Sequence, residues 1–163
     1  MFERIGIVGA GAMGRGIAQL FASAGKQVWL HDARSASISE ALRFNRELLE
    51  RGVAKGRLSV AELDATLARM QAAPALADLS GCDLVIEAIV ENLEAKQALF
   101  IELESLLAED TVLATNTSSL SVTRIAAACQ HPERVAGFHF FNPVPLMKLV
   151  EVVRGERSDP QVI

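Results

Sequence analysis

The chain has 163 residues, half of them hydrophobic, and carries a formal net charge of -4. This length suits one domain, and this composition is sufficient to fill a hydrophobic core. A mildly acidic chain gives no reason to expect nucleic-acid binding, so anionic ligands must be bound by local sites and not by the overall field.

The first half of the chain alternates between strand and helix patterns. A strand is expected at Arg4–Val8, a short apolar run that ends in glycines, and a second strand at Gln27–His31. Helices are expected at Ala12–Ala24, from Ser35 to about Arg51, and from Ser59 to about Met70, with a turn at Gly52–Arg57. Ser59 and Glu62 have the spacing of a capping box. Because a simple unit needs only one helix after the second strand, we interpret the last two helices as a helical hairpin that projects from the fold.

The second half continues this alternation and then changes character. Strands are expected at Asp83–Ala88, Thr111–Thr115, Val135–Phe140 and Lys148–Val153, and helices from Leu93 (capped by Asn92) to about Leu107 and at Ser121–Cys129. Only Phe141–Met147 separate the last two strands, and no helix fits there, so these strands should be antiparallel neighbours. The whole pattern predicts an α/β fold: a doubly wound, Rossmann-type sheet that is mostly parallel, with antiparallel strands at its C-terminal end.

Residues 1–157 contain all of these elements and are expected to form one domain. Ser158-Asp159-Pro160 has the cap-then-proline pattern of a helix start, and the chain ends at Ile163. We therefore expect residues 158–163 to begin a linker or helix that leads to a further domain which the chain lacks.

A glycine-rich hexad follows the first strand and opens the first helix, as a dinucleotide-binding motif requires. Its residues are Gly9, Ala10, Gly11, Ala12, Met13 and Gly14. The first glycine permits the tight turn, the second lets the backbone approach a pyrophosphate, and the third lets the helix pack closely on the sheet. The free N–H groups at the helix start supply an anion site.

Asp32 stands at the end of the second predicted strand, where a carboxylate accepts hydrogen bonds from the adenosine ribose and repels a 2′-phosphate. The position favours NAD over NADP as cofactor. Arg34 points the other way, because a nearby arginine can accommodate that phosphate. The simpler alternative is a glycine-rich turn followed by a solvated surface acid.

Cysteine, histidine and N-terminal patterns exclude other classes. Cys82 and Cys129 lie far apart in apolar or helical surroundings, which indicates reduced, buried thiols. The three histidines have no metal-ligand spacing with each other or with the cysteines, so we expect no metal. The N-terminal stretch has no basic leader, and glycines interrupt its apolar run, so we expect neither a signal peptide nor a membrane span and regard a cytoplasmic protein as the default.

Three segments are more specific than the glycine motif: Glu87–Asn92 (EAIVEN), Thr115–Leu120 (TNTSSL) and Gly137–Val153 (GFHFFNPVPLMKLVEVV). They closely resemble the 3-hydroxyacyl-CoA dehydrogenase family, which includes the 3-hydroxybutyryl-CoA dehydrogenases, and the resemblance covers the whole chain. It implies the NAD-dependent oxidation of L-3-hydroxyacyl-CoA to 3-oxoacyl-CoA, or the reverse, in fatty acid metabolism. It also implies a C-terminal helical domain that supplies the contacts of a homodimer, and an isolated NAD domain that is nearly inactive.

His139 and Glu151 are the candidate catalytic pair. Oxidation of a secondary alcohol needs a base for the hydroxyl proton, and a histidine is the natural base near neutral pH. If the last two strands pair antiparallel, residues 139 and 151 can lie opposite or diagonal to each other, and the carboxylate would orient the imidazole. A lone histidine between phenylalanines is otherwise more often a core residue, but the resemblance assigns catalysis to this pair.

The resemblance assigns roles to further residues. It places the hydroxyl of Ser118 on the substrate and the nearby cofactor, Asn142 on the substrate oxygens, and Glu91, Lys96 and Asn116 at the nicotinamide end of NAD. Ser118 and Asn142 could otherwise belong to turns, and Lys96 could be an ordinary solvated helix residue.

Arg51, Lys55 and Arg57 gather at the tip of the predicted hairpin. They form either a solvated turn or a grip on coenzyme A phosphates, and the resemblance supports Lys55 more than Arg57.

Two other functions are compatible with parts of this pattern. One is an NAD(P)-dependent dehydrogenase of a free hydroxy acid, in which a lysine usually replaces the His–Glu pair. The other is a dinucleotide-binding module without catalysis, which would need neither that pair nor Ser118.

An apolar surface facing the absent domain is expected at Phe141, Val144, Pro145, Leu146 and Met147.

Overall fold

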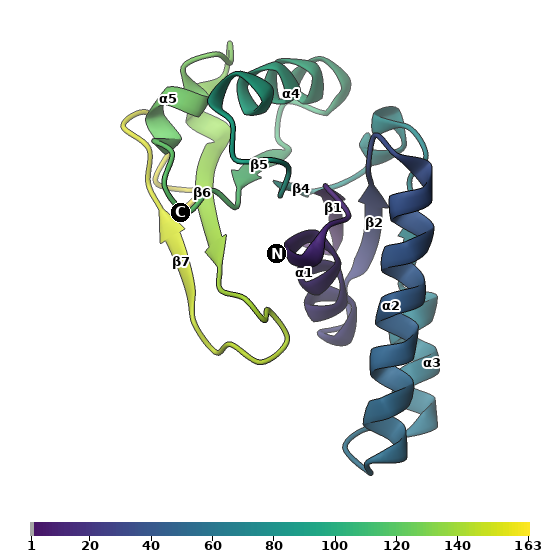
Figure 1. The fold of residues 1–163 in the computed structure, drawn as a ribbon. Coiled ribbons are helices and arrows are strands. Elements are labelled where there is room, and N and C mark those ends of the chain that lie inside the picture. The colour runs from purple at the N-terminus through teal and green to yellow at the C-terminus, as the bar shows by residue number, and fades with distance from the viewer. Residues whose placement is uncertain (1) are drawn as a thin grey trace.

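A computed structural model describes residues 2–163, which form one sheet with helices on both of its faces (Figure 1). The sheet has seven strands in the order β3-β2-β1-β4-β5-β6-β7. Their bounds are β1 Arg4–Val8, β2 Gln27–His31, β3 Met70–Ala72, β4 Leu84–Glu87, β5 Val112–Thr115, β6 Val135–Phe140 and β7 Val150–Val153. All neighbouring pairs are parallel except β6 and β7, which confirms the predicted fold class.

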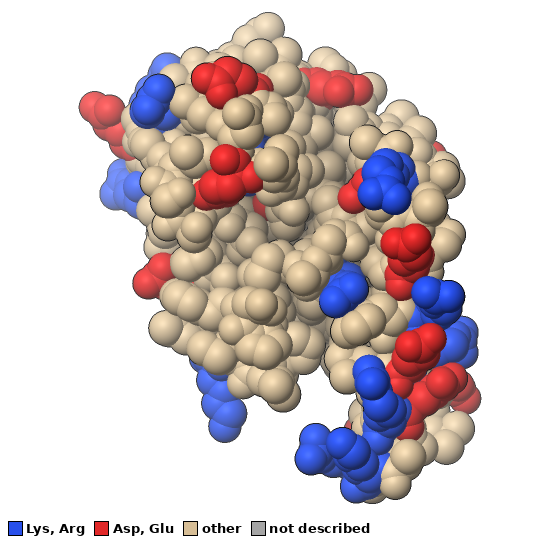
Figure 2. All heavy atoms as spheres, in the orientation of Figure 1, with Lys and Arg blue, Asp and Glu red and all other residues tan. Residues whose placement is uncertain are grey.

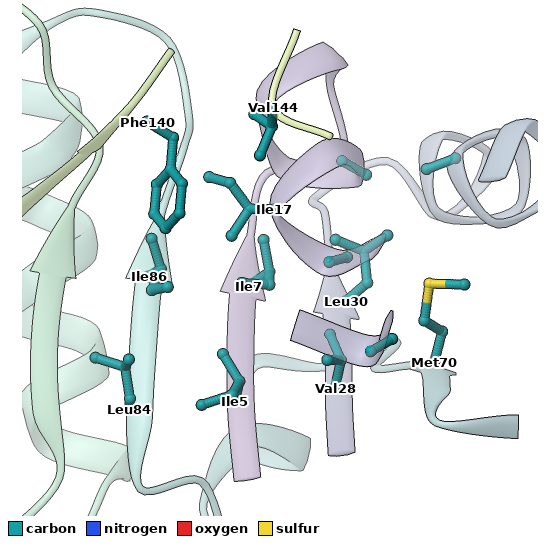
Figure 3. Close-up of a cluster of buried hydrophobic side chains, with 14 of the residues drawn as sticks. Ile5, Ile7, Ile17, Val28, Leu30, Met70, Leu84, Ile86, Phe140 and Val144 are labelled. Carbon is teal, nitrogen blue, oxygen red and sulfur yellow. The ribbon is translucent and has the colours of Figure 1, made fainter. Parts of the chain in front are cut away.

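The helices are α1 Ala12–Ser23, α2 Ser35–Ala54, α3 Val60–Ala68, α4 Leu93–Leu106 and α5 Val122–Ala126, with two short 3-10 helices, η1 Leu76–Leu79 and η2 Pro132–Arg134. Successive residues of a central strand face opposite sides: Leu84 and Ile86 pack with α1, whereas Val85 packs with α4 and α5. Because both faces are covered at the centre of the sheet, β1 and β4 are apolar along most of their length. Figure 3 shows the cluster on the α1 side. None of the helices within residues 2–163 is long and apolar enough to cross a membrane.

The helices α2 and α3 form the predicted hairpin, which projects away from the sheet in Figure 1. The capping box is confirmed, since Ser59 Oγ accepts the Glu62 N–H at 3.1 Å and a Glu62 carboxylate oxygen accepts the Ser59 N–H at 2.8 Å. The predicted turn at Gly52–Arg57 is too long, because α2 continues to Ala54. Helix capping therefore fixes the start of α3. The end of α2 is marked by Gly56, which has φ +68°, and the N–H groups of Gly56 and Arg57 donate to the carbonyls of Val53 and Gly52 at 2.9 and 3.0 Å.

Two segments differ from expectation. The chain forms a strand, β3, where the helix was expected to end at Met70, and β3 extends the sheet beside β2. Three residues are too few to show the alternation of a strand, so Met70–Ala72 form a strand only because they pair with β2. At the expected helix start, Asp159 Oδ1 accepts the Gln161 N–H at 2.7 Å, as a capping residue does, and residues 160–162 form a turn. The Ser158 hydroxyl instead donates to the Val135 carbonyl at 2.5 Å.

Candidate functional site

The glycine motif lies where β1 ends and α1 begins. Gly9 has φ +105°, and a Cβ there would meet the Ala88 carbonyl oxygen at 2.5 Å; at Gly14 it would meet the Gly9 oxygen at 1.7 Å. The fold itself therefore requires these two glycines. Gly11 differs, because a Cβ there would meet no atom within 4 Å. Bare backbone at Gly11 thus faces open space, as the approach of a pyrophosphate needs.

The start of α1 can hold an anion. No side chain caps this helix, whose N-cap is Gly11. The first N–H groups of a helix have no partner inside it, and a phosphate is a natural acceptor for them. The backbone at Ala12, Met13 and Gly14 therefore fits the diphosphate of a dinucleotide.

Asp32 is tied to this loop. One carboxylate oxygen accepts the Ala10 N–H at 2.8 Å, and the other accepts the Arg34 N–H at 2.9 Å. These two bonds fix the carboxylate at the end of β2, one strand away from the glycine loop. Its remaining lone pairs are available to ribose hydroxyls, as the sequence motif predicts.

His139 and Glu151 lie directly opposite each other on β6 and β7. The imidazole Nδ1 is 2.9 Å from a carboxylate oxygen of Glu151, and 18% of the histidine side chain is exposed. The ring of Phe141 lies 4.5 Å from the imidazole ring. If Nδ1–H donates to the carboxylate, Nε2 is left as the proton acceptor, which is the arrangement that a general base requires.

Glu91 organises the loop that carries Ser118. One oxygen of Glu91 accepts the Thr117 hydroxyl, and the Ser118 N–H donates to the same oxygen at 3.1 Å. Desolvation raises the pKa of Glu91, but the Thr117 hydroxyl and the Lys96 charge lower it by more, so the pKa lies at about 2. Glu91 is therefore ionised throughout the neutral range. The Ser118 residue itself is exposed next to it.

Lys96 is not a solvated helix residue. Its side chain is 1% exposed, pairs with Glu87, and lies 3.4 Å from a carboxylate oxygen of Glu91. Sequence reasoning missed Glu87, which is fully buried. The available signal was an acid at the end of an otherwise apolar buried strand.

Asn116 links two strand ends. Its side-chain oxygen accepts the Phe140 N–H at 2.8 Å, and its own N–H donates to the Glu87 carbonyl at 2.9 Å. The residue before Phe140 is His139. Asn116 thus joins the end of β5 to the strand that carries the candidate base.

A groove of about 760 Å³ runs between α1, α2 and the loop before β7. Asn142 lines it, as do the basic residues of the hairpin, Arg51, Lys55 and Arg57. Figure 2 shows Lys and Arg side chains gathered over the hairpin tip. The groove therefore connects a cationic end with the loop that follows the candidate base. His139, Glu151 and Ser118 are not among its lining residues.

The expected apolar surface is only partly present. Leu146 is 73% exposed and Met147 42% exposed, but Val144 is 3% exposed. Val144 packs onto α1, where a Cβ on Gly16 would lie 3.0 Å from it, and it belongs to the core cluster in Figure 3. Including Val144 in that surface was therefore wrong.

The remaining titratable side chains form no further centre. Cys82 and Cys129 are buried as expected, and burial raises the pKa of each thiol to about 11. Within residues 2–163, no group of three or more His, Cys, Asp or Glu side chains is placed to hold a metal ion.

Fold and site together define a dinucleotide-binding domain of the Rossmann type, with a His–Glu pair at the carboxyl edge of its sheet. The family described as "3-hydroxyacyl-CoA dehydrogenase, NAD binding domain" matches residues 4–163. The chain belongs to this family, which confirms the predicted family and its cofactor, NAD.

Individual relatives agree. The chain is 44% identical over 161 residues to the 3-hydroxyadipyl-CoA dehydrogenase of Escherichia coli K12, covering 99% of this chain and 34% of the relative. It is 43% identical over 159 residues to a 3-hydroxybutyryl-CoA dehydrogenase of Bradyrhizobium diazoefficiens, covering 98% and 54%. The crystal structure of 3-hydroxybutyryl-CoA dehydrogenase from Escherichia coli K12 superimposes with a TM-score of 0.97 at 43% identity, covering 99% of this chain and 34% of that one. The chain thus spans only about a third to a half of these relatives.

Proposed function

We propose that this chain is the NAD-binding domain of an enzyme that oxidises L-3-hydroxyacyl-CoA to 3-oxoacyl-CoA, or catalyses the reverse reaction. The observation that carries the proposal is the His139–Glu151 pair, with 2.9 Å between Nδ1 and the carboxylate oxygen, at the carboxyl end of β6, the same side of the sheet on which the glycine motif follows β1. The names of two relatives, 3-hydroxyadipyl-CoA dehydrogenase and 3-hydroxybutyryl-CoA dehydrogenase, support the substrate class.

His139 would remove the hydroxyl proton through Nε2 during oxidation. Glu151 would hold the ring in one orientation and stabilise the imidazolium that forms. NAD, when bound, supplies the acceptor for the hydride that leaves C3 of the substrate. In reduction, the protonated His139 would return the proton to the carbonyl oxygen.

Other residues would position the reactants. The glycine loop and Asp32 would hold the diphosphate and the adenosine ribose, and Glu91, Lys96 and Asn116 would lie toward the nicotinamide end. Ser118 and Asn142 would hydrogen-bond the substrate oxygen. Since a reaction between two bound molecules depends on their alignment, these residues would act mainly by orientation.

The groove and its basic end support coenzyme A as the carrier. Lys55 and Arg57 would bind the phosphates, and the groove would guide the pantetheine arm from the hairpin tip toward Asn142. We further propose that residues 158–163 lead from this domain to a helical domain, that the longer protein is a homodimer through that domain, and that it acts in the cytoplasm.

The test is NADH-dependent turnover of acetoacetyl-CoA by a longer protein that contains this domain, with free acetoacetate in parallel. His139→Gln should lower turnover by about 10²–10⁴-fold and leave NADH binding nearly unchanged. His131→Gln is the matched control, because His131 also lies next to a glutamate, Glu133, at 3.0 Å, but on the exposed surface. Turnover of acetoacetate without the thioester, or normal turnover by His139→Gln, would contradict the proposal.

A further inference from the structure

Glu87 places a carboxylate in the core at the carboxyl end of β4, with 0% of its surface exposed. The carboxylate accepts a hydrogen bond from the Lys96 ammonium and another from the Ile89 N–H, the latter at 2.7 Å. The three residues before it in β4 are apolar and buried. A buried ion pair rarely stabilises a protein more than apolar residues of similar volume. Stability therefore does not explain why a charged pair occupies this position.

The first connection from Glu87 runs through Lys96. The ammonium pairs with Glu87 on one side and lies 3.4 Å from Glu91 on the other. Glu91 in turn accepts the N–H groups of Ser118 at 3.1 Å and Ser119 at 3.3 Å. Glu87 is thus linked to the Ser118 loop through the buried Lys96 ammonium and the partly exposed Glu91 carboxylate.

A second connection bypasses Lys96. The Thr115 hydroxyl donates to Glu87 at 2.8 Å and accepts the Thr117 N–H at 3.2 Å. Thr117 also bonds Glu91 through its hydroxyl. Both connections therefore end in the same loop after β5, and in such networks each hydrogen bond depends on the others.

We propose that Glu87 is a positioning residue, which through Lys96 and Thr115 fixes Glu91 and the Ser118 loop at the cofactor end of the site. This inference rests on the proposed function, which assigns Glu91 and the Ser118 loop to the NAD site. Without the charge on Glu87, the buried ammonium would retain only Glu91 as an anionic partner. Glu91 would then be drawn toward Lys96, and its bonds to the Ser118 and Ser119 N–H groups would weaken.

The test compares Glu87→Gln, which keeps the size of the side chain and removes its charge, with the control Thr111→Val. Thr111 also makes a buried hydrogen bond, to the Cys82 carbonyl at 3.1 Å, but at the amino end of β5. Three quantities are measured on the chain: unfolding in urea, the NADH dissociation constant by fluorescence, and the amide NMR signals of Thr117, Ser118 and Ser119.

Glu87→Gln should weaken NADH binding about tenfold, the scale of one hydrogen bond to a charged group, and shift the three amide signals. Thr111→Val should lower the stability of the chain, but it should change neither the NADH affinity nor the three amide signals. A folded Glu87→Gln with wild-type NADH affinity and unchanged amide signals would overturn the proposal.

If Glu87→Gln does not fold, Thr115→Val decides, because it removes only the second connection. It should shift the Thr117 amide signal and weaken NADH binding, and an unchanged signal with unchanged affinity overturns the proposal. Failure of the wild-type chain to bind NADH would instead refute the proposed function. The amide signals would still show whether Glu87 holds the loop.

Discussion

Replacing Asp32 with Ala removes a carboxylate that two backbone N–H groups hold at the end of β2. Of about four lone-pair sites on a carboxylate, two accept the N–H groups of Ala10 and Arg34, at 2.8 and 2.9 Å. The others remain for ribose hydroxyls. One hydrogen bond to a charged group contributes about 1.5–3 kcal/mol, so its loss should weaken NADH binding roughly 10- to 100-fold.

The same change should not weaken NADPH binding to this extent, because it also removes the repulsion between Asp32 and a 2′-phosphate. The ratio of the NADPH to the NADH dissociation constant should therefore fall by about tenfold or more. Fluorescence titration of the chain with each cofactor measures this ratio directly, and differences in protein concentration or active fraction cancel in it.

Asp83→Ala is the matched control. Asp83 also accepts two backbone N–H groups, those of Glu3 and Arg4, each at 2.8 Å, but next to the amino ends of β1 and β4. Both variants lose two hydrogen bonds of the same kind, and only Asp32→Ala should change the cofactor ratio. An unchanged ratio in Asp32→Ala, or an equal change in Asp83→Ala, would refute the reasoning.

Four more outcomes are expected. Gly11→Ala should keep the stability of the wild type and lose NADH affinity, whereas Gly14→Ala should be strongly destabilised; urea unfolding with NADH titration checks both. The lowered pKa of Glu91 contributes stability above its ordinary pKa of 4.5, which is lost as pH falls toward about 2, so Glu91→Gln should flatten the acid side of a stability–pH curve. Lys55→Ala and Arg57→Ala in the longer protein should raise KM for acetoacetyl-CoA with little change in kcat, and equal KM values would argue against a coenzyme A grip. The present chain alone should be nearly inactive in that assay, and a rate comparable with the longer protein would show that the thioester needs no second domain.

Most of the fold could be predicted from the sequence because its signals are local. Strand β1, the glycine loop and α1 follow one another without interruption, so the dinucleotide-binding motif can be recognised within one short stretch of sequence. His139 and Glu151 are joined by one short connection, so antiparallel pairing was enough to bring them together. Such features depend on periodicity and on short separations along the chain.

The tertiary structure decided what depends on distant partners. Lys96 has the sequence pattern of a solvated residue, yet the packing of α4 against the end of β4 buries it beside Glu87. Val144 belongs to a loop, yet it packs in the core against Gly16, where a Cβ would lie only 3.0 Å from it. Strand β3 exists because β2 offers a free edge to three residues. Whether a charged side chain is buried depends on the residues that pack against it in the fold. Whether a short segment forms a strand depends on the strand beside it. Local sequence does not specify either neighbour.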